Sequence, residues 1–119
     1  MGGVRVDGEG GGRRIPVVTA VDGSTVIGVH ARNITLRFTV SNALPEVTAD
    51  NIQWFFVSSN GSQIEVTQDS RHSFSPDRLL LTIDPVVLSD EGNYVFQVNH
   101  ITGVVTSNVV LELHGWYLT

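Results

Sequence analysis

Residue types that could carry out catalysis are present in the sequence, but their spacing indicates no active site. The four histidines are scattered, without the roughly three to five intervening residues of a metal-ligand pair: His30, His72, His100 and His114. No G-x-S-x-G nucleophile turn occurs, and the glycine run 10–12 lacks the Lys-Ser/Thr of a phosphate loop. We therefore expect no enzyme activity and no catalytic, cofactor-binding or metal-binding residues.

The charged residues also limit the possible partners. Asp84, Asp90 and Glu91 lie close together and are interpreted as solvated loop charge. Seven basic residues against twelve acidic ones give a net charge of -5, which argues against a nucleic-acid partner. No apolar run approaches the roughly 18 residues that a membrane span needs, so we expect no direct membrane insertion.

The sequence contains no cysteine, which excludes disulfides, cysteine–zinc sites and thiol nucleophiles. This absence mildly favours a reducing compartment. Two N-x-[ST] sequons point instead to an extracellular glycoprotein, at Asn33-Ile34-Thr35 and Asn60-Gly61-Ser62. Chance alone predicts roughly one sequon in a chain of this composition, so Asn33 and Asn60 are only candidate glycosylation sites.

Within the segments that must position these residues, hydrophobic and polar side chains alternate with a period of two. Turn-forming residues separate one segment from the next. Residues 34–40 show the clearest alternation, and 52–57 (IQWFFV) is the most aromatic segment. Strands are also expected at 15–21, 25–29, 64–66, 70–74, 79–83, 94–98 and 104–113. About eight or nine short strands, without a sustained helical pattern, predict an all-β fold with two antiparallel sheets packed as a Greek-key sandwich.

The two ends of the chain differ in composition from this middle part. Residues 1–14 are rich in glycine and are expected to form a flexible leader or an expression remnant. Residues 15–114 form the predicted domain, and 115–119 are a tail or the start of a linker in which Trp116 and Tyr117 contact a neighbouring domain.

The segment 81–96 carries a family resemblance. It reproduces the spacing of the pattern L-x-I-x-x-V-x-x-x-D-x-G-x-Y-x-C, except that phenylalanine replaces the final cysteine. The matching residues are Leu81, Ile83, Val86, Asp90, Gly92, Tyr94 and Phe96. Trp54 stands on the strand where that family places its core tryptophan. On these residues the sequence resembles the immunoglobulin superfamily, in its intermediate (I-set) type, over roughly residues 15–113.

The resemblance implies specific structural roles. Tyr94 would bond back to the backbone near Asp90, and Gly92 would occupy a turn too tight for a side chain. Asp90 would pair with Arg71, with Arg78 as the alternative partner. Phe38 and Phe96 look like replacements for the two family cysteines, and would form the structural core with Trp54, Leu81 and Tyr94.

The resemblance also implies a function. We expect a non-catalytic protein-binding or adhesion module of a larger cell-surface or matrix protein, with homophilic partners or neighbouring domains of the same chain. Phe55, on the opposite strand face from Trp54, is a candidate binding residue if exposed. The alternative is an intracellular structural immunoglobulin domain of a giant muscle or cytoskeletal protein. A third possibility is an accessory domain that positions a neighbouring catalytic or receptor domain.

Overall fold

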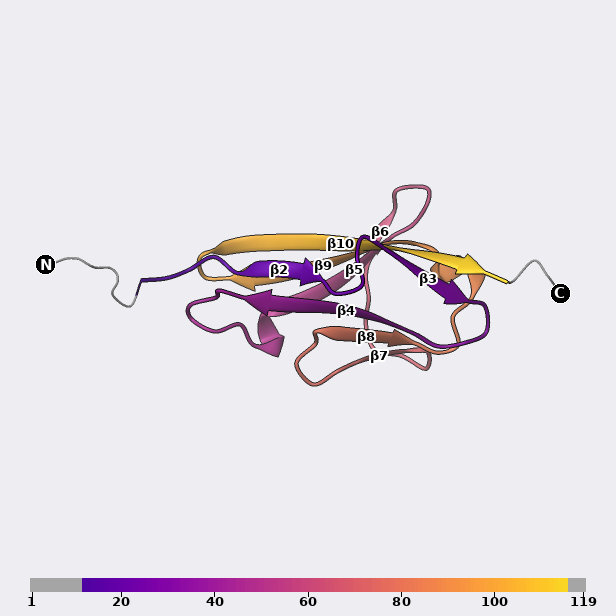
Figure 1. Ribbon diagram of the computed structural model, residues 1–119, viewed down its shortest axis with the longest axis horizontal. Coiled ribbons are helices and arrows are strands. Elements are labelled where there is room, and N and C mark those ends of the chain that lie inside the picture. Colours follow the sequence, from indigo (N-terminus) through magenta and orange to yellow (C-terminus); the bar gives the residue numbers. More distant parts are fainter. Residues whose placement is uncertain (1–11, 116–119) are drawn as a thin grey trace, which may run out of the picture.

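The computed structural model describes residues 12–115 of the chain (Figure 1). Most of the expected leader, and the predicted contacts of Trp116 and Tyr117, lie outside these residues. Backbone pairing begins at Arg14, one residue before the expected start of the domain, because Arg14 bridges to Leu44. The Arg14 N–H donates to the Leu44 carbonyl oxygen at 2.9 Å.

The described chain forms two sheets, as the alternating pattern predicts. One sheet has five strands in the order β3-β10-β9-β5-β6, and the other has four in the order β2-β4-β8-β7 (Figure 1). The strands of the five-stranded sheet are β3 (Thr25–Val29), β10 (Gly103–His114), β9 (Gly92–His100), β5 (Ile52–Val57) and β6 (Gln63–Glu65). Those of the four-stranded sheet are β2 (Val17–Ala20), β4 (Ile34–Ser41), β8 (Leu80–Ile83) and β7 (His72–Phe74).

One strand pair departs from the expected antiparallel arrangement. β2 pairs with β4 in one sheet, and after the turn at Gly23 the chain crosses to the other sheet as β3. There β3 runs parallel to β10. Gly23 adopts φ +90°, a backbone conformation that favours glycine, which explains why this crossing is made at the Asp22-Gly23-Ser24 turn.

Two single-turn 3₁₀ helices connect strands, η1 (Ala49–Asn51) and η2 (Leu88–Asp90). Their three-residue length explains why no helical period could be seen in the sequence. Neither has the length or the apolar character needed to cross a membrane, and the described residues contain no other helix.

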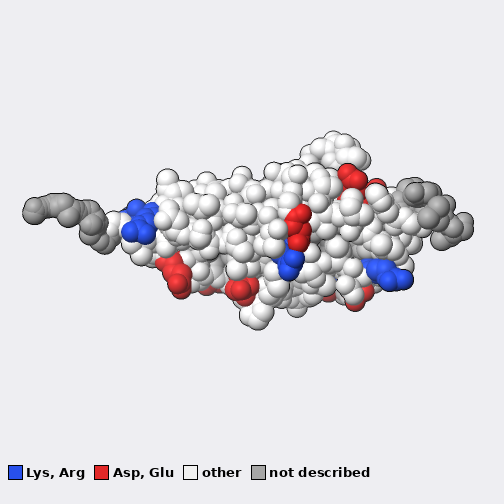
Figure 2. Space-filling model, viewed as in Figure 1, with Lys and Arg blue, Asp and Glu red and all other residues white. Residues whose placement is uncertain are grey.

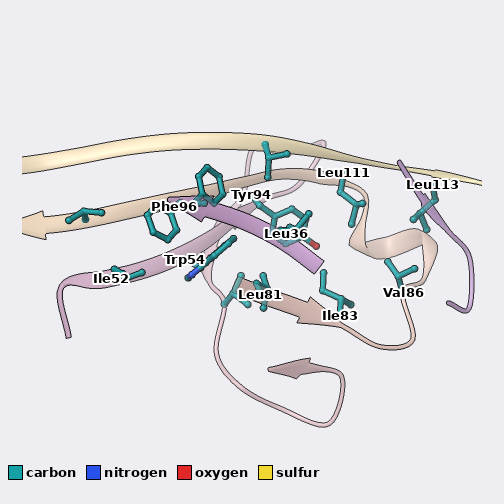
Figure 3. Packing of buried hydrophobic residues seen from close by; sticks show 14 residues of the cluster. Leu36, Ile52, Trp54, Leu81, Ile83, Val86, Tyr94, Phe96, Leu111 and Leu113 are labelled. Carbon is teal, nitrogen blue, oxygen red and sulfur yellow. The ribbon is translucent and has the colours of Figure 1, made fainter. Parts of the chain in front are cut away.

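Three aromatic rings form the centre of the core between the sheets. Phe38 on β4 stacks on Phe96 of β9, with ring centroids 4.6 Å apart and an interplanar angle of 12°. Both rings meet Trp54 edge-on, at centroid distances of 5.3 Å and 5.1 Å. Figure 3 shows Trp54 and Phe96 inside the cluster of buried side chains. Aromatic contacts therefore join the two sheets at the centre of the core.

The rest of the core follows from the period-two pattern of the strands. Alternate residues of β4, β8 and β9, and of the second half of β10, point between the sheets and are buried (Figure 3). They include Leu36, Phe38, Leu81, Ile83, Val109, Leu111 and Leu113. The Trp54 indole N–H donates to the Arg78 carbonyl oxygen at 2.8 Å, so its polar atom is satisfied within the core.

We predict that Phe96→Ala destabilises the domain by about 3–5 kcal/mol, because it removes the ring that contacts both Phe38 and Trp54 and leaves a cavity. Urea denaturation followed by tryptophan fluorescence measures the loss. Phe55→Ala is the matched control, since it removes the same ring from the outward side of β5. The stability lost in this variant should be clearly smaller. Equal losses in the two variants would contradict this account of the core.

Candidate binding face

The turn before β9 is held together by a buried carboxylate. Asp90 is 6% exposed, and its oxygens accept hydrogen bonds from Arg71 Nη1 at 2.7 Å, Arg71 Nη2 at 3.1 Å and the Val87 N–H at 2.8 Å. The Asp90 carbonyl oxygen accepts the Tyr94 hydroxyl at 2.7 Å. Burial, followed by the charge of Asp90, raises the pKa of the Tyr94 hydroxyl.

This arrangement corrects one interpretation of the sequence. Asp90 is not solvated loop charge, and the neighbouring Glu91 accepts the Leu113 N–H at 2.6 Å on β10. Asp84 alone of the three carboxylates is exposed. Arg78, the alternative partner of Asp90, instead donates from Nε to the Ile52 carbonyl oxygen at 3.1 Å and lies 4.2 Å from the centroid of the Phe74 ring.

Gly92 begins β9 at a point where a side chain has no room. Its φ is +151°, and a Cβ atom there would lie 2.8 Å from Phe56 Cε1 and 2.9 Å from the Val57 carbonyl oxygen. The glycine thus permits β9 to approach β5 closely, and the pairing of these strands sets which residues point out of the five-stranded sheet.

The outward side of the five-stranded sheet has an apolar centre. Phe55 on β5 is paired with Val95 on β9, and both side chains are partly buried on this side of the sheet. Asn108 on β10 lies beyond Val95 in the same row, and Glu65 on β6 lies beyond Phe55. We call this surface the Phe55 face. Its members are Gln53, Phe55, Val57, Glu65, Asn93, Val95, Gln97, Asn99, Val104, Thr106, Asn108 and Val110.

Side-chain amides border the apolar centre of the Phe55 face and are bonded to one another. Asn99 Nδ2 donates to Gln53 Oε1 at 2.9 Å, and Gln97 Nε2 donates to Asn99 Oδ1 at 2.9 Å. On the other side of the centre, Asn108 Nδ2 donates to Asn93 Oδ1 at 2.8 Å. These contacts fix the amides in place, so the face presents ordered donors and acceptors beside Phe55.

The Phe55 face has almost no charge. Glu65 is the one ionisable residue of the named set, which contains neither lysine nor arginine, while Glu112 and His114 lie farther along the outward side of β10. Depletion of charge together with a partly exposed aromatic side chain is typical of the centre of a protein–protein interface. An ordered, neutral surface of this kind can bind another protein surface without a large desolvation penalty for buried charge.

The two sequons lie on exposed residues. Asn60 occupies the turn between β5 and β6, where its Oδ1 accepts bonds from the Ser58 hydroxyl and from the Ser62 N–H at 2.9 Å. Asn33 precedes β4 and is also exposed. The amide nitrogen of neither residue has a hydrogen-bond partner among the described residues, which leaves the glycan-acceptor atoms open to solvent.

The histidines do not assemble a site. In the described part of the chain, no three acidic or histidine side chains are arranged to hold a metal ion. His72 Nδ1 contacts Asp69 Oδ1 at 2.8 Å, and this bond lowers the pKa of Asp69 to about 2. His100 is buried and contacts the Thr102 hydroxyl through Nδ1 and the Pro45 carbonyl oxygen through Nε2, which links two loops.

Comparison with known proteins gives similarity in structure only. No family model and no curated protein matches the sequence. A structure titled "Structural basis for Dscam isoform specificity" is similar over 82% of this chain and 24% of its own, with a TM-score of 0.67 and 20% identity. The N-terminal four Ig domains of Dscam1 isoform 9.44 are similar over 86% of this chain and 25% of theirs, with a TM-score of 0.68 and 22% identity.

The described chain folds as an immunoglobulin-like domain. It spans about a quarter of the length of these Dscam structures. The immunoglobulin fold explains the positions of Trp54 and Tyr94, which the sequence motif indicated. No motif marks the amide network of the Phe55 face, since single asparagines and glutamines on alternate strand positions look like ordinary solvent-facing residues.

We predict that Asp90→Asn destabilises this immunoglobulin-like domain by about 2–3 kcal/mol, because it removes the charge that accepts the two Arg71 bonds. Thermal and urea denaturation at neutral pH measure the change. Asp84→Asn, six residues earlier and exposed, should stay within about 0.5 kcal/mol of the parent chain. A stability loss in Asp84→Asn as large as that in Asp90→Asn would show that the pair has no special role.

Proposed function

We propose that this immunoglobulin-like domain is a non-catalytic recognition module that binds another protein through the Phe55 face. The observation that carries the proposal is the partly exposed Phe55–Val95 pair, bordered by fixed amides and nearly free of charge. Aromatic side chains in such surroundings supply much of the binding energy of protein interfaces.

The chemistry of the Phe55 face defines the partner. A complementary surface would place an apolar side chain on Phe55 and Val95, and amide or backbone groups opposite Gln97 and Asn108. Glu65 stands at the edge of the face, where it would attract a basic residue of the partner. Solved Dscam structures with this fold include one whose title concerns isoform specificity, which supports a role in recognition.

The strand arrangement supports the intermediate (I-set) type. The Phe55 face includes β6, a strand beside β5 that the constant type lacks, while the further strand of the variable type does not occur among the described residues. We propose that the domain belongs to a larger cell-surface or matrix protein, in which it also contacts neighbouring domains of the same chain.

We predict that Phe55→Glu abolishes binding to the partner, because it places a charge at the apolar centre of the face. Proteins captured by the immobilised domain from an extracellular fraction would be identified, and their affinities measured by surface plasmon resonance. Thr39→Glu is the matched control, since Thr39 is exposed on β4 in the other sheet and the charge change is the same. An affinity reduced equally by both variants, or by neither, would reject the Phe55 face as the binding site.

We predict that the domain is secreted in folded form with sugar attached at Asn60 or Asn33 when a secretory signal precedes it in animal cells. Mass spectrometry would measure glycan occupancy, and a variant carrying Asn33→Gln and Asn60→Gln is the control. Retention of the parent chain together with secretion of that variant would favour the alternative, an intracellular structural domain, which the absence of cysteine also favours.

A further inference from the structure

β3 is an edge strand whose outer side carries no protective feature. It is the longest of the four edge strands, with five residues against three in β6, three in β7 and four in β2. Its sequence TVIGV contains neither charge nor proline, and Ile27 and Val29 are 48% and 49% exposed. Natural edge strands usually carry charges, prolines or bulges that prevent pairing with another chain.

The parallel ladder determines which backbone groups of β3 remain available. At its two ends the Val110 N–H donates to the Ser24 carbonyl oxygen at 2.9 Å, and the His30 N–H donates to the His114 carbonyl oxygen at 3.4 Å. Because the bonding residues of a strand alternate, the even-numbered residues of β3 face β10. Thr25 and Ile27 therefore turn both N–H and C=O to the open side.

These outward groups have no other use within the described chain. No hydrogen bond between described residues involves the backbone N–H or C=O of Thr25 or Ile27. A shallow hollow runs beside the edge, lined by Val26 and Ile27 of β3 and by Ile34 and Thr35 of β4. A further strand can therefore approach β3 without displacing another element.

We propose that two copies of this domain pair through β3, antiparallel and about a twofold axis at Val26. Thr25 of one copy then lies opposite Ile27 of the second copy, and the reverse. Each such pair exchanges two N–H···O=C bonds, because both residues present donor and acceptor outward. The five-stranded sheets of the two copies become one continuous sheet.

A second copy suits this edge because β3 carries no charge that would oppose the same strand of another copy. A twofold axis at Val26 places Thr25 opposite Ile27 on both sides of the axis. No like charges meet along β3, and the nearest charges, Asp22 and Arg37, form an ion pair with 2.6 Å between Oδ1 and Nη2. Figure 2 shows one adjoining acidic and basic group near the middle of a mostly uncharged surface, with further charged groups toward the two ends of the view.

This inference is independent of the Phe55 face. The axis passes through the sheet, so both copies expose that face on the same side of the joined sheet. Phe55→Glu should therefore leave self-association unchanged, while loss of pairing through β3 should leave binding by a single Phe55 face unchanged. Failure of one proposal can thus be distinguished from failure of the other.

The test uses sedimentation equilibrium of the whole chain from about 1 μM to about 1 mM, the range of weak association. We expect concentration-dependent dimers for the parent chain and for Ile27→Ala, which keeps the backbone groups. Ile27→Pro removes the outward N–H but no bond to β10, so we expect a folded monomer with at least tenfold weaker association. A parent chain that stays monomeric, or an Ile27→Pro variant that associates equally well, would overturn the proposal.

Cross-linking tests the register and does not depend on the proline variant. The chain has no cysteine, so Val26→Cys provides a single thiol next to its own copy, about 4.5 Å away between Cα atoms. We expect Val26→Cys to form a disulfide dimer much faster than Thr25→Cys or Ile27→Cys. Equal cross-linking rates in the three variants would overturn the register. If the chain stays monomeric and its Ile27 amide is protected from hydrogen exchange only when a different protein is added, β3 pairs with a strand of that protein and the proposal is overturned.

Discussion

The contact between Phe38, Phe96 and Trp54 is the interaction on which the rest of the molecule depends. It joins β4 in one sheet to β9 and β5 in the other, where no covalent link is available. Burial of each phenylalanine contributes roughly 1.5–3 kcal/mol, comparable with the lower range for a disulfide. Because β5 and β9 also carry the Phe55 face on their opposite side, this contact fixes the surface that we propose for binding.

The fold could be predicted because its determinants are local or periodic. Alternation on 34–40 and 94–98, together with the spacing of Trp54, Asp90 and Tyr94, indicates both the sandwich and its family resemblance. The parallel pairing of β3 with β10 could not be predicted, since nothing in TVIGV distinguishes a parallel partner from an antiparallel one. The burial of Asp90 could be predicted only from the family resemblance, because a carboxylate in a loop is usually exposed.

The candidate surfaces were less predictable than the fold because each depends on residues that are distant in sequence. Phe55 could be named from its position on an aromatic strand, but its apolar partner Val95 and the amides around it depend on the register of β9 and β10. The backbone groups on the open side of β3 depend on whether its even- or odd-numbered residues bond to β10. The pairing of Thr25 with Val110, 85 positions apart in the chain, decides this. Sequence periodicity alone does not contain such information.

The parallel arrangement of β3 and β10 also has a mechanical consequence. The described chain enters the sandwich at one end and leaves it at the other (Figure 1). Tension applied between these ends would draw β3 and β10 past each other along their length. Their ladder, from the Ser24–Val110 bond to the His30–His114 bond, would then be loaded in shear, with all its bonds sharing the force at once. The domain would resist stretching until the ladder ruptured as a unit.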